Sequence, residues 1–320
     1  MRKRCSRKWS LVAFKHNLQL CWIKAIEIFK LCSTPASIIS PAPFFAISLF
    51  LVSNEININN FSIFFSGIVV SLFSSFGSNL WNHCNDIKED TAQGKKTILT
   101  QDISIQRIAL FTAILFYLTS ILIVFYLSIE IKRPIYIYFL IWSLTTWWYS
   151  DNIILKKITG FRLKDHYITE LITYGVAWPM YTLSLWLIFS DLNINGLILS
   201  VAFFFFGISL LLLKDLKDIS GDRKAGLKTL GVVFSPSRLI RFSSILMVFY
   251  FIIMLNPLTI SVFGKANLIL LVPFIYFLKN TYMPMSKKNW KLEIRDIKVI
   301  RGIGYSSFAS IIFIGLRGFY

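Results

Sequence analysis

Residues 86–97 read Asp-Ile-Lys-Glu-Asp-Thr-Ala-Gln-Gly-Lys-Lys-Thr, and residues 218–229 read Asp-Ile-Ser-Gly-Asp-Arg-Lys-Ala-Gly-Leu-Lys-Thr. Both follow one ungapped pattern, Asp-Ile-x-x-Asp-x-x-x-Gly-x-Lys-Thr, and we call them box one and box two. Carboxylates at the border of a membrane are costly, and they generally mark a functional site. Two boxes facing each other would form an acidic cage that suits a divalent metal ion and, through the metal, a polyphosphate.

The rest of the chain is strongly apolar. Its 320 residues are 55% hydrophobic, with a mean hydropathy of +0.63. This composition excludes an ordinary soluble domain and predicts an all-α integral membrane protein with a single polytopic domain over residues 35–320. We expect about nine transmembrane helices, at residues 35–53, 61–81, 108–129, 134–150, 168–190, 194–213, 239–258, 266–278 and 302–316.

Both boxes directly follow an even-numbered predicted span. An even number of spans separates them, so they lie on the same side of the membrane. The pattern therefore indicates an internal repeat that covers spans two and three, and again spans six and seven. Repeats of this kind often hold their site at the interface between the two halves.

The net charge of +18 is distributed very unevenly between the two sides of the membrane. Of the 34 Lys and Arg residues, 30 fall on the side of the boxes and only Lys132, Arg133, Lys265 and Arg317 on the other. Because positive loops stay inside, this asymmetry predicts that the N-terminus and the boxes are cytoplasmic in a protein of the cell membrane. The basic residues are spread over loops between spans, which argues against nucleic-acid binding.

Residues 1–34 form a basic N-terminal segment. Apolar residues recur at intervals of three and four, with lysines between them, which is typical of an amphipathic helix lying on the membrane surface. The stripe consists of Leu11, Phe14, Leu18, Cys21, Trp22, Ala25 and Phe29. A simple cytoplasmic extension explains the same residues equally well. The four cysteines show no metal-binding spacing, which predicts free thiols.

The polar side chains of the boxes fall into two helical stripes, because residues four apart share one face of a helix. Each stripe continues an even-numbered span; they are Asn82, Asp86 and Asp90, and Asp215, Asp218 and Asp222. Repulsion within a stripe calls for a counter-ion. Mg²⁺ fits, since it takes one or two carboxylates and completes its shell with water and phosphate oxygens. One box alone is explained equally well as a solvated helix end, but two identically spaced boxes favour a site.

Each box ends in glycine and lysine. Gly94 and Gly226 allow the chain to leave the helix, and the lysines return positive charge toward bound phosphates. The cations predicted to bind an anionic group are Lys96, Lys228, Arg223 and, from the loop after the fourth span, Lys157. The same loop begins with Tyr149-Ser150-Asp151-Asn152 and leads to Glu170, a residue type that also favours a helix N-terminus.

These residues resemble the UbiA superfamily of intramembrane prenyltransferases. Asn82-x-x-x-Asp86-x-x-x-Asp90 is similar to its first motif, and the segment from Lys214 to Leu230 is similar to its second. The second motif most resembles the naphthoate, chlorophyll and geranylgeranylglyceryl-phosphate branches. The first motif departs from the family, since His83 stands where aspartate is common and no Arg-Pro follows.

The resemblance implies a UbiA-like helical bundle that transfers an isoprenyl group from a polyprenyl diphosphate to a small acceptor. Two Mg²⁺ ions are expected on Asp86, Asp90, Asp215, Asp218 and Asp222, with Asn82 assisting and Asp86, Asp90, Asp218 and Asp222 essential for catalysis. Lys96, Lys157, Arg223 and Lys228 are expected to bind the diphosphate. The acceptor stays open between an aromatic quinone precursor and a glycerol-phosphate lipid. The alternative is a membrane transporter with an acidic metal or substrate site on its cytoplasmic side.

Overall fold

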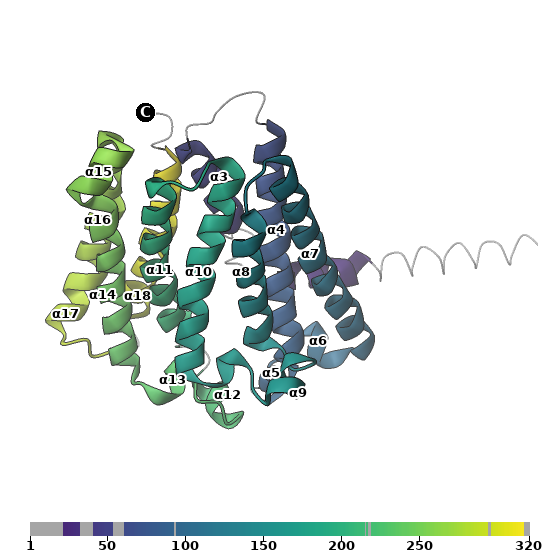
Figure 1. The fold of residues 1–320 in the computed structure, drawn as a ribbon. Coiled ribbons are helices and arrows are strands. Elements are labelled where there is room, and N and C mark those ends of the chain that lie inside the picture. Colours follow the sequence, from purple (N-terminus) through teal and green to yellow (C-terminus); the bar gives the residue numbers. More distant parts are fainter. Residues whose placement is uncertain are drawn as a thin grey trace, which may run out of the picture.

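The structure is a computed structural model that describes residues 22–32, 41–53, 61–92, 94–214, 216, 219–293 and 296–316. Within these ranges the chain is helical, and the one bridge of strand type is an isolated pair between His166 and Lys228. The long helices stand side by side in one bundle (Figure 1). They are α3 (Pro41–Val52), α4 (Phe61–Asn85), α7 (Ile103–Glu130), α8 (Ile135–Ser150), α10 (Tyr167–Phe189), α11 (Ile194–Lys214), α14 (Pro236–Leu255) and α18 (Ile297–Leu316).

Between α14 and α18 the chain is helical but irregular. Two short helices, α15 (Pro257–Phe263) and the 3₁₀ turn η4 (Lys265–Leu270), lead into α16 (Leu271–Phe277). A π-helical stretch, η5 (Leu278–Tyr282), then connects α16 to α17 (Met283–Lys287). These pieces together cover the eighth predicted span.

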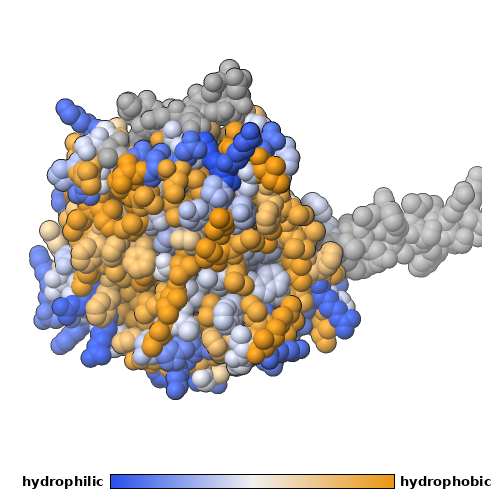
Figure 2. All heavy atoms as spheres, viewed as in Figure 1, coloured by the Kyte–Doolittle hydropathy of each residue, from blue (hydrophilic) through white to orange (hydrophobic). Residues whose placement is uncertain are grey.

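The all-α membrane class is confirmed, and the chain is an integral membrane protein. Each of the nine predicted segments falls on a described helix, but a count of nine spans is not confirmed. By length and composition six can cross a membrane, namely α4, α7, α10, α11, α14 and the stretch Lys265–Lys287. The 12 residues of α3 and the 16 of α8 fall short of the roughly 20 that a span needs. Figure 2 shows hydrophobic side chains across the middle of the molecule and hydrophilic ones toward its two ends.

The predicted internal repeat is present in the backbone. The helix inside box one, α5 (Ile87–Ala92), and the helix inside box two, α12 (Ile219–Lys224), begin and end 132 positions apart. The next helices, α6 (Ile98–Gln101) and α13 (Leu230–Val233), repeat with the same offset. The flanking long helices also correspond, since α4 packs against α7 as α11 packs against α14.

The glycine of each box ends its short helix as predicted. Gly94 has a φ of 72° and Gly226 a φ of 75°, the left-handed region in which a Cβ is strained. In both boxes the amide one residue after the glycine donates back across the turn: Lys95 N to Asp90 O at 2.9 Å, and Leu227 N to Asp222 O at 2.9 Å. This is the Schellman closure of a helix C-terminus, so one turn geometry positions the second aspartate of both boxes.

The described part of the N-terminal segment, residues 22–32, is a helix that lies against α4 and the start of α7. Asn79 donates a hydrogen bond to the carbonyl oxygen of Cys32 at 3.1 Å, and Lys24 pairs with Asp102 at 3.3 Å. Trp22 and Phe29, two members of the predicted apolar stripe, are exposed. The other members up to Cys21 lie outside the described residues. Contact of this helix with the membrane surface stays a prediction.

Candidate active site

A pocket of about 120 Å³ opens where the two boxes meet. Figure 1 places α5, α12 and the short helix α9 (Leu155–Thr159) together at one end of the bundle, and α5 and α12 are in direct contact. The pocket is lined by Asn82, His83, Asp86, Glu89, Asp90 and Lys95 around box one, by Tyr149, Lys164, Glu170 and Lys214 from the segments between the boxes, and by Asp222, Leu227 and Thr229 of box two.

The predicted stripe of box one lies in this pocket. Helical hydrogen bonds continue from α4 into α5, with Asp86 N donating to Asn82 O at 3.0 Å and Asp90 N to Asp86 O at 2.8 Å. The three side chains therefore stay on one face, and all three line the pocket. Ser150 donates to the amide oxygen of Asn82, which fixes that amide toward the loop after α8.

Each aspartate of box one has a lysine partner. Lys95 Nζ lies 3.1 Å from Asp90 Oδ1, and the buried ammonium of Lys164 pairs with Asp86. Lys164 belongs to the 3₁₀ turn η2 (Leu163–Asp165), which follows α9 and precedes α10. A lysine beside a carboxylate occupies the position that a divalent cation would compete for.

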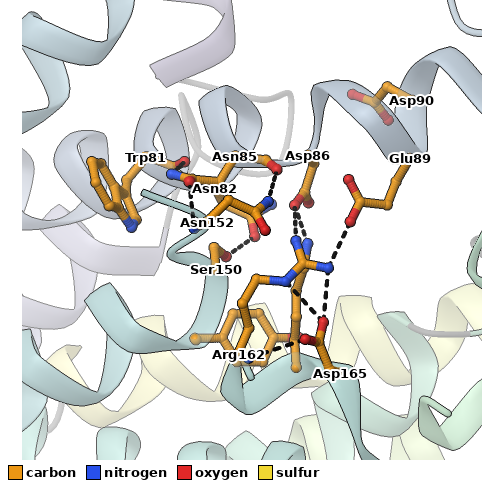
Figure 3. Close-up of polar contacts among 12 residues, drawn as sticks. Trp81, Asn82, Asn85, Asp86, Glu89, Asp90, Ser150, Asn152, Arg162 and Asp165 are labelled. Atoms are coloured by element: carbon orange, nitrogen blue, oxygen red, sulfur yellow. Dashed lines mark hydrogen bonds and ion pairs between the residues drawn. The ribbon is translucent and has the colours of Figure 1, made fainter. Parts of the chain in front are cut away.

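Arg162 anchors the same loop beneath box one. Its guanidinium is buried, and it donates to Glu89 Oε1 at 2.6 Å and contacts Asp165 Oδ1 at 2.7 Å, with Asp86 Oδ1 at 3.9 Å. Figure 3 shows it between Asp165 on one side and Glu89 and Asp86 on the other. Burial disfavours the charged guanidinium, but Glu89 and Asp165 outweigh it and raise the pKa of Arg162 above its ordinary value.

Box two contributes Asp222 to the pocket, and Thr229 Oγ1 donates to Asp222 Oδ2 at 2.9 Å. Asp215 and Asp218 lie outside the described residues, so their predicted metal contacts stay predictions. The main chain of Lys228 is tied to the loop from η2, since Lys228 N donates to Asp165 O at 3.0 Å and Tyr167 N to Lys228 O at 2.8 Å.

The four predicted anion-binding cations do not line the pocket. Lys96, Lys157, Arg223 and Lys228 are all exposed and are not among the residues that line it. Their contact with a diphosphate stays a prediction. The lysines that do line the pocket are Lys95, Lys164 and Lys214. Sequence reasoning gave them no primary role, although each stands in or beside a segment that it singled out.

The loop after α8 is held by its own polar residues. Buried Asp151 accepts from the amides of Ile153 at 2.7 Å and Leu155 at 2.7 Å and so holds the turn that leads into α9. Asn85 and Asn152 are joined by two hydrogen bonds, from Asn152 N to Asn85 Oδ1 at 2.8 Å and from Asn152 Nδ2 to Asn85 O at 2.6 Å. These contacts fix the loop against the end of α4 (Figure 3).

The donor set of the pocket fits Mg²⁺. Five carboxylates face three lysines in the described lining, so a bare diphosphate would enter a pocket that already carries excess negative charge. Oxygen ligands of this kind are those that Mg²⁺ prefers. In addition, the buried Glu89 Oε2 has no hydrogen-bond partner within the described residues. No three acidic, His or Cys groups in the described part gather around one point, and Asp215 and Asp218 lie outside that part.

Comparisons with known proteins agree with this architecture. An uncharacterised protein of Archaeoglobus fulgidus is 31% identical over 290 residues, which is 89% of this chain and 96% of that protein. The structure of a digeranylgeranylglyceryl phosphate synthase superposes with a TM-score of 0.61 at 18% identity, covering 92% of this chain and 98% of the other.

A second solved structure, a UbiA homologue from Archaeoglobus fulgidus bound to DMAPP and Mg²⁺, superposes with a TM-score of 0.55 at 16% identity, covering 91% of this chain and 98% of the other. These structural likenesses concern the fold. The family model named UbiA prenyltransferase family matches residues 41–291, a range that contains both boxes and the loop between them. On this match and on its paired acidic boxes, the chain belongs to the UbiA prenyltransferase family.

Proposed function

We propose that this protein transfers an isoprenyl group from a polyprenyl diphosphate to a small acceptor, with Mg²⁺-assisted loss of diphosphate. The observation that carries the proposal is the pocket in which Asn82, Asp86 and Asp90 of one repeat face Asp222 of the other. Membership of a prenyltransferase family supports the reaction class. The Archaeoglobus fulgidus homologue bound to DMAPP and Mg²⁺ supports the pairing of a prenyl diphosphate with that metal.

The acidic and the basic residues of the pocket have different proposed roles. Asp86, Asp90 and Asp222, together with Asp218 of box two and Asp215 just before it, would hold two Mg²⁺ ions, with Asn82 assisting. The bound ions would supply charge neutralisation for the departing diphosphate. Lys164 and Lys95 add positive charge from the protein, since each ammonium lies beside a box-one carboxylate and lines the pocket. The reaction would require that water be kept from the allylic cation, which water would otherwise intercept.

The direct test is diphosphate release by the full chain in lipid nanodiscs. We expect release from geranylgeranyl diphosphate to need Mg²⁺, to stop with EDTA and to return when Mg²⁺ is restored. The acceptors to supply are dihydroxynaphthoate, hydroxybenzoate, homogentisate and geranylgeranylglyceryl phosphate. The acceptor that supports release would assign the branch. Unchanged release in EDTA would contradict the metal role, and binding without release would place the acceptor outside this panel.

Lys164 and Lys157 form a matched pair of lysine variants in one loop. We expect Lys164→Met to weaken binding of geranylgeranyl diphosphate by about tenfold, because a charge-assisted hydrogen bond contributes roughly 1.5–3 kcal/mol. The sequence predicts that Lys157 binds the diphosphate, but Lys157 is exposed on α9 and does not line the pocket. We therefore expect Lys157→Met to change the affinity by less than about threefold, as for a screened surface charge. Titration of both variants in Mg²⁺ measures the difference. A larger loss for Lys157→Met would favour the exposed lysine as the diphosphate ligand.

The transporter alternative is not favoured. Transporter sites usually lie near the middle of the bilayer, whereas this pocket lies at the ends of α4, α8 and α11, beside α5 and α12 (Figure 1). The same placement supports active-site loops on the cytoplasmic side, which the positive-inside asymmetry predicts. An aromatic quinone precursor and a glycerol-phosphate lipid both remain acceptors under this proposal.

A further inference from the structure

Three polar side chains from three long helices meet on one side of the pocket. Tyr149 stands at the end of α8, Glu170 at the start of α10, and Lys214 at the end of α11. Tyr149 Oη donates to Glu170 Oε1 at 2.6 Å, and Lys214 Nζ donates to Tyr149 Oη at 2.7 Å. Glu170 is 1% exposed, yet all three residues line the pocket. The carboxylate is therefore shielded from solvent but connected to the site through a phenol.

The donor and acceptor capacities of Lys214, Tyr149 and Glu170 fix the direction of these two hydrogen bonds. An ammonium only donates, so the phenol oxygen must accept from Lys214 and its own proton must point to Glu170. The ammonium also lies over the ring of Tyr149, 4.9 Å from its centroid, and over the ring of Tyr174 at 5.7 Å. These cation–π contacts hold the ammonium in place beside the phenol oxygen. The other carboxylate oxygen, Glu170 Oε2, accepts from the amide of Leu230 at 3.4 Å.

Prenyl transfer leaves one proton to remove, and none of the groups assigned above accepts it. The acceptor gives up a proton from its hydroxyl or aromatic carbon when it bonds to the allylic carbon. Asp86, Asp90 and Asp222 are assigned to the metal ions, and a metal-bound carboxylate is a weak base. Glu170 is a carboxylate that lines the pocket and lies outside both boxes. The hydroxyl of Tyr149, which also lines the pocket, already donates a hydrogen bond to it.

We propose that Tyr149 and Glu170 form a proton relay that deprotonates the acceptor, with Lys214 holding the phenol in register. The inference rests on the proposed prenyl transfer. The acceptor atom bonds to the allylic carbon, and the carbon–oxygen bond to diphosphate breaks, with its electron pair leaving on the diphosphate. The acceptor proton passes to Tyr149 Oη while the phenol proton passes to Glu170. Glu170 gains one proton in total and later returns it to water.

Charged groups surround this pair on several sides. The pocket presents Lys214 from α11, Lys164 from η2, His83 from α4, Asp86 between α4 and α5, Glu89 and Asp90 from α5 and Asp222 from α12. The neighbouring α13 contributes the amide of Leu230, which donates to Glu170. The relay requires a carboxyl group at position 170 to take up the proton.

The test uses Tyr149→Phe and Glu170→Gln in the full chain, with geranylgeranyl diphosphate and the acceptor that supports turnover. We expect each variant to lower kcat by about 10²-fold or more, the usual contribution of general acid–base catalysis. The KM for geranylgeranyl diphosphate should stay within about twofold, because the diphosphate contacts are intact. Tyr149→Phe keeps the ring beneath Lys214, so it tests the hydroxyl alone.

Matched controls remove the same atoms elsewhere. Tyr167→Phe loses a hydroxyl from a ring that packs on His166 and Phe234 outside the pocket, and Glu130→Gln loses an exposed carboxylate at the far end of α7. Both should behave as wild type. Wild-type kcat in Tyr149→Phe and Glu170→Gln would overturn the relay and leave the proposed function standing, and so would a loss confined to substrate binding. A wild-type protein that neither binds geranylgeranyl diphosphate in Mg²⁺ nor transfers its prenyl group would overturn both.

Discussion

Asp222→Asn is expected to lower prenyl transfer by about 10³-fold while the protein still inserts in the membrane and folds. The substitution keeps the size and one oxygen of the side chain but removes its negative charge from the pocket that box one and box two share. A loss of 10³ corresponds to roughly 4 kcal/mol of transition-state stabilisation, the scale on which a charge placed at a reacting centre acts. Diphosphate release under saturating Mg²⁺ measures it, and Asp86→Asn should behave alike.

The control for this experiment is Asp191→Asn. Asp191 is an exposed aspartate that pairs with Arg133 at 2.7 Å, in the connection between α10 and α11 and away from the pocket. Asp191→Asn removes the same negative charge as Asp222→Asn, so it separates a local effect in the pocket from an effect of the net charge. We expect full activity in this variant. Activity near wild type in Asp222→Asn would show that the second box does not hold the metal and would remove the basis for a two-box cage.

The sequence predicted those features of the fold that local chemistry decides. The lengths of the apolar stretches predicted where the helices lie. The identical spacing of the two boxes predicted the repeat that α5 and α12 display. Gly94 and Gly226 ended their helices as expected because only glycine occupies the left-handed region without strain. The number of spans was less certain, since α3 and α8 are short and depend on packing rather than on their own apolar length.

The composition of the pocket could be predicted only in part. Asn82, Asp86, Asp90 and Asp222 line it as their helical spacing suggested. The lysines could not be chosen from spacing, because positive-inside loops contain many lysines and only folding buries one of them, Lys164, beside Asp86.

Glu170 was interpreted from sequence as a residue that favours a helix N-terminus. Its partner Tyr149 lies 21 residues earlier, on another helix. The one local signal was a carboxylate at a span end on the same side as the boxes. A contact between side chains of two different helices depends on how the helices pack. The residue pattern within one helix carries no information about that packing.

Arg162 is the residue of the loop whose loss should cost the most stability. Its side chain is buried and bonded to Glu89 at 2.6 Å and to Asp165 at 2.7 Å. Arg162→Met keeps most of the volume but leaves the buried carboxylate of Glu89 without its cation. Breaking a buried ion pair from one side costs about 3–5 kcal/mol. We expect a loss of that size in the free energy of unfolding, measured by denaturant titration in mixed micelles.

The double variant Arg162→Met with Glu89→Met distinguishes charge from packing. Replacing both partners of a buried pair by apolar residues is often neutral or stabilising, so the double variant should recover most of the stability that Arg162→Met loses. Asp165 loses the guanidinium in both the single and the double variant, so it affects the two equally. Its other carboxylate oxygen keeps the hydrogen bond from the backbone amide of residue 162, which is 3.0 Å long in the wild type. Arg238→Met, on the exposed first turn of α14, is the matched control. If Arg162→Met costs no more than Arg238→Met, the buried cluster contributes nothing to holding the loop beneath Asp86. If the double variant is as unstable as the single one, the loss comes from packing around Arg162 and not from an unpaired charge on Glu89.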